Sequence, residues 1–383
     1  MSGTPRFRQA ANSILLPLLL AVPAVAPAQQ QADYSSVMPL AARSLLLDIA
    51  PAGERLVVVG EHGHVLYSDD GGSSWQQARV PTRQMLTAVY FVSPRHGWAV
   101  GHDGLVLTTD DAGENWRIQR DGLADQLFRN RKNREDALAR VDALQRALAD
   151  SPAPERDELE AQLEDAEFDL EDAEQALEAP VFASPLMDVW FQDPQRGWAV
   201  GAFGTMLVTG DGGEHWSSRP DLVDNPEELH LNAITGDGSG RLLVAGESGL
   251  LYRSLDAGVN WESLEPVYEG SWFGALYSDV RDNLLVFGLR GHLYRSEDFG
   301  DSWEAVPWGG DTTLAGGTAS RSGAIALAGG VGHVLLSRDG GLTFAATVMP
   351  HRAGLSSALL HDGLLTVVGQ GGVQTRGVEG MDE

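Results

Sequence analysis

The stretch GWAVGHDGLVLTTDDAGENW at residues 97–116 returns almost unchanged as GWAVGAFGTMLVTGDGGEHW at residues 197–216. Both end in the pattern Ser/Thr-x-Asp-x-Gly-x-x-aromatic, termed the box below, which occurs six times in the chain. The aspartate and aromatic residues of the boxes are Asp70 and Trp75, Asp111 and Trp116, Asp211 and Trp216, Asp256 and Trp261, Asp298 and Trp303, and Asp339 and Phe344. Successive aspartates lie 41, 100, 45, 42 and 41 residues apart. Without an insertion at 121–180, the period is about forty residues throughout.

A Gly-x-x-Gly pair precedes each box, and a seventh pair near the C-terminus has no box. The pairs are Gly60/Gly63, Gly101/Gly104, Gly201/Gly204, Gly246/Gly249, Gly288/Gly291, Gly329/Gly332 and Gly369/Gly372. Segments such as RLVVVG and HVLYS on either side are rich in Val, Leu and aromatic residues, which is typical of strands. Each unit therefore predicts four strands, the third and fourth joined at the box. Four-stranded units repeated about an axis form a β-propeller.

Closure of the ring decides the number of blades. The last unit, SALLHDGLLTVVGQGGVQTRG, has room for three strands. We expect residues 32–40 to supply a fourth strand, which would join both ends of the chain in one blade and leave no open edge. The sequence thus predicts an all-β fold, a seven-bladed propeller of four-stranded blades, with six or eight blades as the alternatives.

The box residues have a structural explanation. The Ser or Thr hydroxyl and the Asp carboxylate can bond backbone N–H groups of a tight turn, and the glycine adopts a conformation closed to other residues. We expect the aromatic residue to pack the turn onto its own sheet. A calcium loop is the competing interpretation, but a box has too few acidic ligands. We predict no metal and no cofactor, although five histidines lie at the Gly-x-x-Gly turns: His62, His64, His102, His292 and His333.

Residues 121–180 contain neither motif and predict an antiparallel coiled-coil hairpin between blades two and three. The seam positions, spaced as in heptads, are Ala137, Val141, Leu144 and Leu148, and then Leu159, Leu163, Ala166, Leu170, Ala173 and Leu177. Ser151 and Pro152 are expected to cap and start the second helix. The first arm is rich in basic residues and the second in acidic ones. Either the arms neutralise each other and the rest is a solvated face, or the hairpin is a docking arm, which we favour.

The N-terminal segment predicts export. Arg6 and Arg8 precede an apolar run of 13 residues, and the small residues at 26–28 offer a cleavage site. A membrane anchor is the alternative, but the run is short for one. We expect the mature protein in the periplasm or an equivalent compartment. The predicted parts are a signal peptide (1–28), the closing strand with blades one and two (29–120), the hairpin (121–180), and the remaining blades with a C-terminal tail (181–383).

The formal net charge of −27 excludes nucleic acid as a partner and argues against binding to anionic membranes, unless basic residues are clustered. In a propeller, the connections between blades and the Gly-x-x-Gly turns share one face. Arg43, Arg83 and Arg352 lie at the entries to the inner strands of blades one, two and seven, which become neighbours on closure. Arg290, inside a Gly-x-x-Gly turn, adds to this arc. We expect the arc to bind a carboxylate or phosphate; alternatively, each arginine pairs with a nearby acid.

The boxes match the Asp-box, or BNR, repeat. Joined to GWAVG-x-x-G, as in SPRHGWAVGHDGLVLTTDDAGENW, they resemble the photosystem II stability/assembly factor family of seven-bladed propellers. The resemblance implies a non-catalytic exported factor that helps a membrane protein complex to assemble, with an arginine-rich patch, and does not require the complex to be photosynthetic. The chain departs from the family in lacking a lipid-attachment cysteine and in carrying the insertion.

Two other classes of function are compatible with some of these features. A sialidase-like glycosidase shares the boxes and an arginine triad, but it needs a late Tyr nucleophile with a Glu partner, and the last tyrosine here is Tyr294. No nucleophile elbow, metal signature or phosphate loop is present either, so we predict that the chain is not an enzyme. A carbohydrate- or lipid-binding accessory protein of an envelope transporter is the alternative. For the assembly factor and for the accessory protein alike, any membrane association would be made through the partner.

Overall fold

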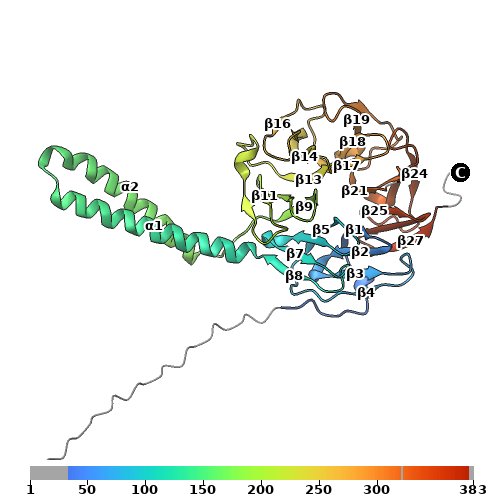
Figure 1. Ribbon diagram of the computed structural model, residues 1–383, viewed down its shortest axis with the longest axis horizontal. Coiled ribbons are helices and arrows are strands. Elements are labelled where there is room, and N and C mark those ends of the chain that lie inside the picture. The colour runs from blue at the N-terminus through green and yellow to red at the C-terminus, as the bar shows by residue number, and fades with distance from the viewer. Residues whose placement is uncertain (1–32, 321, 379–383) are drawn as a thin grey trace, which may run out of the picture. The chain divides into compact units, whose positions relative to one another are not determined.

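The computed structural model describes residues 33–320 and 322–378. Its antiparallel sheets are arranged in a ring, with the first strand of each sheet innermost (Figure 1). Six sheets have four strands and the last has three, which confirms the predicted seven-bladed propeller and corrects the strand number of its last blade. The predicted signal peptide at 1–28 lies outside the described residues.

The strands follow the chain order within each blade. Blade one contains β1 (Leu46–Ala52), β2 (Arg55–Gly60), β3 (Val65–Ser68) and β4 (Gln76–Gln77), and blade two contains β5 (Leu86–Phe91), β6 (Gly97–Gly101), β7 (Val106–Thr109) and β8 (Arg117–Arg120). Blade three contains β9 (Leu186–Phe191), β10 (Gly197–Gly201), β11 (Met206–Thr209) and β12 (Ser217–Ser218), and blade four contains β13 (Leu231–Gly236), β14 (Leu242–Gly246), β15 (Leu251–Ser254) and β16 (Glu262–Ser263).

The remaining blades continue this order. Blade five contains β17 (Trp272–Ser278), β18 (Asn283–Gly288), β19 (Leu293–Ser296) and β20 (Glu304–Ala305). Blade six contains β21 (Leu314–Ala319), β22 (Ile325–Gly329), β23 (His333–Ser337) and β24 (Ala345–Val348), and blade seven contains β25 (Leu355–His361), β26 (Leu364–Gly369) and β27 (Gln374–Gly377). Short 3-10 helices fill five of the Gly-x-x-Gly turns: η2 (Glu61–Gly63), η3 (His102–Gly104), η5 (Glu247–Gly249), η6 (Leu289–Gly291) and η7 (Gly330–Gly332).

The apolar core lies between the blades. Its buried side chains form seven clusters, and each cluster combines residues of two neighbouring blades. Trp116 of blade two, for example, packs with Val57 and Val59 of blade one. All six box aromatics lie in such clusters, so they pack onto their own sheet, as in the edge-to-face pairs of Trp116 with Phe91 and of Trp216 with Phe191, and also onto the preceding blade. An aromatic side chain reaches the preceding blade because both sheets must bury the faces that they turn to each other.

The ring closes by packing of blade one against blade seven, without a shared sheet. Leu46, Ile49 and Val58 contact Leu359 and Val368 in one cluster. The first box adds to this contact, since a Cβ atom at Gly72 would meet the side chain of Thr375 in β27. Closure of the ring therefore depends on side-chain packing between blade one and blade seven.

The prediction that residues 32–40 form the fourth strand of blade seven is wrong. Within the described part of this segment there is no strand; it runs along blade one instead. The backbone N–H of Ser35 donates to the carbonyl of Val80, and the Arg79 guanidinium lies 4.4 Å from the centre of the Tyr34 ring. Contacts with blade one thus take the place of the expected strand pairing, for which Pro39 lacks an N–H.

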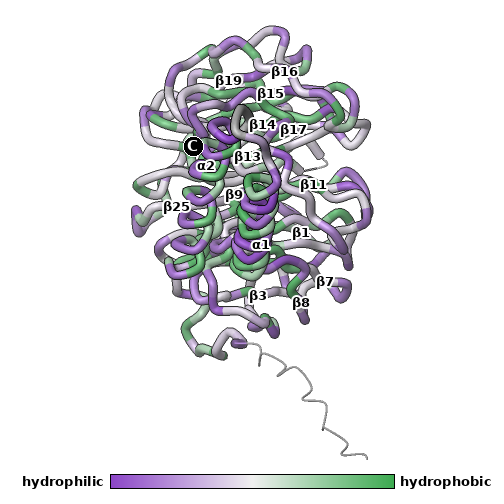
Figure 2. The backbone as a smooth tube through the Cα atoms, turned by 90° about the vertical axis from the view of Figure 1, so that its left-hand side faces the viewer, coloured by the Kyte–Doolittle hydropathy of each residue, from purple (hydrophilic) through white to green (hydrophobic). Residues whose placement is uncertain are grey.

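The insertion forms two helices, α1 (Gly122–Asp150) and α2 (Ala153–Glu178), which pack against each other (Figure 1). The predicted seam faces inward, with Val141, Ala166 and Ala173 buried. Both hydrophilic and hydrophobic positions occur in α1 when the chain is coloured by hydropathy (Figure 2). Neither described helix is long and apolar enough to cross a bilayer.

The turn of the hairpin differs from its prediction. Ser151 does not cap α2; its hydroxyl donates to the carbonyl of Ala147 at the end of α1, at 2.7 Å. Pro152 occupies the position before the first residue of α2, so the second helix starts one residue later than expected. The fixed φ of proline still prepares the chain for helix entry at this point.

Candidate functional site

The boxes occupy one face of the ring and make the same bonds each time. In blade two, Asp111 accepts from the Thr109 hydroxyl at 2.9 Å and from the backbone N–H and side chain of Asn115 at 3.0 and 2.8 Å. The same three bonds occur at the aspartates of the other boxes: Asp70, Asp211, Asp256, Asp298 and Asp339. The carboxylate oxygens are thus used inside the turn.

These bonds favour the charged carboxylate. The Ser74 hydroxyl, followed by the Ser74 backbone N–H, lowers the pKa of Asp70 to about 2. The backbone N–H of His215 is the main cause that lowers the pKa of Asp211 to about 2. Because hydrogen-bond donors surround them, the box aspartates have no role that would require proton transfer near neutral pH.

The Gly-x-x-Gly turns form the opposite face. The second residue between the glycines adopts a left-handed backbone in six turns: His62, Asp103, Phe203, Ser248, Arg290 and Val331. Left-handed residues other than glycine are uncommon, and a β-branched residue such as Val331 is an outlier. The shared turn therefore holds a different side chain at one equivalent position around the ring.

The hairpin starts and ends on this face. The Arg120 guanidinium donates to the carbonyl of Gly104 and pairs with Asp125 of α1 at 2.9 Å, and its side chain is only 10% exposed. Asp121 caps α1 by accepting from the N–H groups of Leu123 and Ala124. A Cβ atom at Gly104 would lie 3.4 Å from the Cα of Gly122 and 3.5 Å from the carbonyl oxygen of Ser184, so both ends of the hairpin meet at one turn.

The predicted arginines lie at successive blade junctions of the same face. A Cβ atom at Gly332, Gly372 or Gly63 would approach the Cα of Arg352, Arg43 or Arg83 to 3.0, 2.5 or 3.2 Å, respectively. The three residues thus mark the junctions of blades six and seven, seven and one, and one and two. This close approach, together with a positive φ, explains why each of these turns ends in glycine.

The arginines differ in their partners. Arg83 pairs with Asp33 at 3.0 Å, but both side chains are mostly exposed, so this pair is weak. In the described parts of the chain, Arg43, Arg290 and Arg352 are exposed and form no ion pair. Arg290 lies in the turn of blade five, one blade further round the ring than Arg352, and it occupies a Gly-x-x-Gly turn where the other three precede an inner strand.

The histidines at the turns have other environments than metal ligands would need. His64 is buried and bonds the Ser44 hydroxyl at 3.0 Å, and its burial lowers its pKa. His292 stacks on Tyr268 with 3.8 Å between the ring centres. Within the described residues, Glu54, His361 and Asp362 could converge on a cation, but two of them are exposed and they lie away from the predicted histidines.

Polar residues on the innermost strands were missed by the sequence analysis. Asp48 accepts from the backbone N–H of Val89, and Asp188 accepts from that of Ile234, each at 2.9 Å and each in the next blade. Thr87, Asn232 and Thr318 bond a backbone carbonyl of a neighbouring inner strand in a similar way. An isolated polar residue in an otherwise apolar inner strand, as in LTAVYF and LMDVWF, was the available signal, and it does not reveal which blade provides the partner.

The two inner carboxyls are poorly solvated. Desolvation raises the pKa of Asp48 to about 6 and that of Asp188 to about 7, with a smaller repulsive contribution from Asp48 to Asp188. Both residues lie near the start of their strands, at the Gly-x-x-Gly face. Their protonation therefore changes close to neutral pH, unlike that of the box aspartates.

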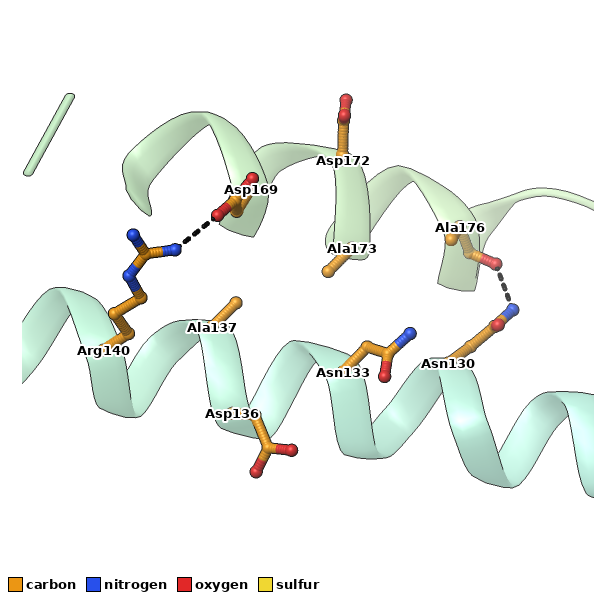
Figure 3. Close-up of a pocket in the computed structure, with 9 residues that line it drawn as sticks. All are labelled: Asn130, Asn133, Asp136, Ala137, Arg140, Asp169, Asp172, Ala173 and Ala176. Atoms are coloured by element: carbon orange, nitrogen blue, oxygen red, sulfur yellow. Dashed lines mark hydrogen bonds and ion pairs between the residues drawn. The ribbon is translucent and has the colours of Figure 1, made fainter. Parts of the chain in front are cut away.

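A shallow groove runs between the helices of the hairpin (Figure 3). Its floor contains Ala137, Ala173 and Ala176, while the Arg140–Asp169 ion pair of 2.8 Å closes one end and Asn130 bonds the carbonyl of Ala176 near the other. Besides this pair, only Arg134 and Glu174 form an ion pair between the described side chains of the two arms, so most acids of α2 are not neutralised by α1.

Comparison with known proteins confirms the resemblance. The family described as Photosynthesis system II assembly factor YCF48 matches residues 72–133 and 171–307, together more than half of the chain. Photosystem II assembly lipoprotein Ycf48 of Synechococcus sp. (strain CC9902) is 40% identical over 90 residues, 23% of this chain and 26% of that protein. The match thus spans about a quarter of that relative's length.

Solved structures of low sequence identity share the fold. YCF48 bound to D1 peptide has a TM-score of 0.58 at 16% identity, with 88% of this chain and 94% of that chain covered. YCF48 from Cyanidioschyzon merolae has a TM-score of 0.57 at 16% identity, with 88% and 96% covered. The computationally designed Ika8 protein has a TM-score of 0.53 at 10% identity, with 88% and 97% covered.

Proposed function

The chain belongs to the Photosynthesis system II assembly factor YCF48 family, and from this premise we propose that it is an exported, non-catalytic factor that assists the assembly or stability of a membrane protein complex of the photosystem II type. The boxes carry no part of this role, because their polar atoms bond within each turn. The Gly-x-x-Gly face is the binding surface, since it displays side chains that differ from blade to blade.

The observation that carries the proposal is the placement of Arg352, Arg43 and Arg83 at three successive junctions of one face. Guanidinium groups bind carboxylates and phosphates with two parallel hydrogen bonds. On a chain with a formal net charge of −27, such an arc is a local site for an anionic group of the partner. A structure of one relative was solved with a D1 peptide bound, which suggests the first probe.

Binding of a synthetic D1 peptide to the purified chain tests the proposal. We expect the variant Arg43→Ala, Arg83→Ala, Arg352→Ala to bind at least about tenfold more weakly, and the binding of the parent protein to weaken as salt is raised. The matched control is Arg95→Ala, Arg117→Ala, Arg281→Ala, which changes three arginines near the box face. Equal binding by the parent and both variants would contradict the assignment of the arc.

An assay of the parent protein and of the variant Arg43→Ala, Arg83→Ala, Arg352→Ala on acidic sugar substrates distinguishes this role from a sialidase-like activity. The proposed function predicts no hydrolysis by either. Turnover by the parent protein that disappears in the triple variant would replace the assembly role with glycoside hydrolysis. The same purified samples serve both measurements.

A further inference from the structure

Two exposed phenylalanines meet where the hairpin rejoins the ring. Phe182 follows α2 in the segment that leads to β9, and Phe203 lies in the Gly-x-x-Gly turn of blade three. Their ring centres are 6.0 Å apart with an edge-to-face orientation, yet the two residues are 60% and 50% exposed. Neighbouring large apolar side chains that stay exposed on a protein surface often mark a binding site.

The turn of blade three holds Phe203 outward. Its φ of 55° is left-handed, and the residue occupies the same turn position as His62, Arg290 and Val331. His230, which precedes β13 of the next blade, packs edge-to-face on the Phe203 ring at 5.1 Å. Phe182, Phe203 and His230 therefore form one surface, termed the aromatic patch below, which draws on the hairpin exit and on blades three and four.

Carboxylates border the aromatic patch. Glu247 accepts from the backbone N–H of His230 at 2.8 Å, and its other oxygen lies 3.6 Å from the His230 ring nitrogen. Glu228 lies next to the turn that holds Phe203, since a Cβ atom at Gly204 would be 3.7 Å from its Cα. Glu227 and Glu228 are both exposed.

The charge at the junction of blades three and four, where Glu228 lies, is opposite to that of the arginine arc. Glu228 and Arg352 have the same left-handed backbone, with φ of 51° and 49°. Each N–H donates to the carbonyl three residues earlier, Asn225 or Met349, and each Cα packs against the last glycine of the preceding turn. The fold thus places Glu at one junction and Arg at the equivalent junction, on one face.

We propose that the aromatic patch, with Glu228 and Glu247 at its border, is a second docking site that binds a polypeptide segment carrying an apolar side chain next to Lys or Arg. The rings offer apolar surface to the partner's side chain and their faces attract its cationic neighbour. The carboxylates add attraction for that cation. An anionic membrane surface is a poor occupant for the same reason, because it would be repelled by the acids.

This site uses none of the residues of the arginine arc, so it extends the proposed function without depending on it. A partner engaging both would present acidic groups over the arc from blade six through blades seven and one to blade two, and a basic, apolar segment over blades three and four. Two sites of opposite charge fix the orientation of a partner better than one.

The test uses fluorescence anisotropy with the full-length mature protein and a labelled peptide in which Leu-Trp is flanked on both sides by Arg. Two comparison peptides replace Leu-Trp by Ser-Ser, or the Arg residues by Glu. We expect the parent protein to bind the first peptide at least about tenfold more tightly than the others. Phe203→Ser and Phe182→Ser should each weaken that binding, and Glu228→Gln should reduce its dependence on salt.

Phe168→Ser is the matched control, because Phe168 is 63% exposed on α2 and lies outside the aromatic patch. It should bind the peptide as the parent does, and so should the triple arginine variant. The proposal is overturned if the parent does not prefer the first peptide, or if Phe203→Ser and Phe168→Ser behave alike. Phe203-dependent sedimentation with phosphatidylcholine vesicles, without a peptide preference, would instead assign the patch to a membrane.

Discussion

The two faces of the propeller are built from turns that recur in the same way but use their side chains differently. On the box face, backbone and side chains repeat together, so that Asp111 and its five counterparts make the same bonds. On the opposite face, the backbone of the Gly-x-x-Gly turn repeats, while the exposed position holds imidazole, carboxylate, phenyl, hydroxyl, guanidinium or isopropyl groups.

The difference distinguishes the face whose hydrogen bonds stabilise the ring from the face whose side chains can bind a partner. A side chain that closes its own turn has no free bonding capacity, so all six boxes can be alike. A side chain held outward by the turn is free to vary without loss of the fold. Changes at the box face should therefore alter stability, and changes at the other face should alter binding.

The largest effect is expected at a box. Asp111→Ala removes the acceptor for Thr109 and for two groups of Asn115, and should lower the free energy of unfolding by about 2 kcal/mol. Asp110→Ala, one residue away, should change it by less than about 0.5 kcal/mol. Urea unfolding of both variants provides the measurement. Similar values for the two would remove the structural distinction between the boxes and their surroundings.

A second test compares two neighbouring residues of one turn on the opposite face. Gly332→Ala should lower stability by about 1–2 kcal/mol, because φ is 77° and the new Cβ would approach the Cα of Arg352 to 3.0 Å. Val331→Gly should leave stability unchanged or raise it by up to about 1 kcal/mol, since glycine relieves the left-handed strain of a residue that is 52% exposed. A thermal unfolding series that ranks them in the opposite order would contradict this view of the turn.

The inner-strand carboxyl of Asp188 and the carboxyls of the box aspartates should contribute to stability with opposite dependence on pH. The pKa of Asp188 is raised to about 7, so its contribution to stability is complete below about pH 4 and is lost as pH rises to about 7. Asp188→Asn should therefore be more stable than the parent at pH 8 and equal to it near pH 4. The lowered pKa of Asp70 and Asp211 predicts the reverse, a loss of stability as pH falls from about 4 to about 2.

Denaturant unfolding of the parent and Asp188→Asn between pH 4 and 8 measures this dependence. The difference between the two proteins isolates the contribution of Asp188 from those of all groups that the two proteins share. A difference in the free energy of unfolding that stays constant across this pH range would show that the pKa of the Asp188 carboxyl is not shifted by the fold.

The smallest effect on stability is expected from the hairpin. Replacing residues 121–180 by a short Gly-Ser linker should change the free energy of unfolding of the ring by less than about 1 kcal/mol, because both ends of the hairpin meet at Gly104. Binding of the Arg-flanked peptide should be retained in part through Phe203. Failure of the shortened protein to fold would make the hairpin part of the core.

Local patterns in the sequence were enough to predict the repeating elements. The bonds of a box join residues two and four positions apart, so the turn can be predicted without knowing what surrounds it. The heptad spacing of α1 and α2 is equally local, and it predicted both helices and the buried Val141, Ala166 and Ala173. The number of units then predicted the number of blades.

Tertiary structure decided every feature that joins distant segments. Residues 33–38 lie along blade one because Tyr34 and Ser35 find partners there, which no strand propensity could indicate. The box aromatics contact the preceding blade as well as their own, and Asp48 and Asp188 each bond a neighbouring blade, because apolar faces and inner-strand carboxyls are satisfied by whichever element packs against them. The meeting of Phe182 with Phe203 depends in the same way on where the hairpin rejoins the ring. The sequence by itself determined the blades and the hairpin, since their hydrogen bonds and spacings are local; only the closed ring decided how they meet.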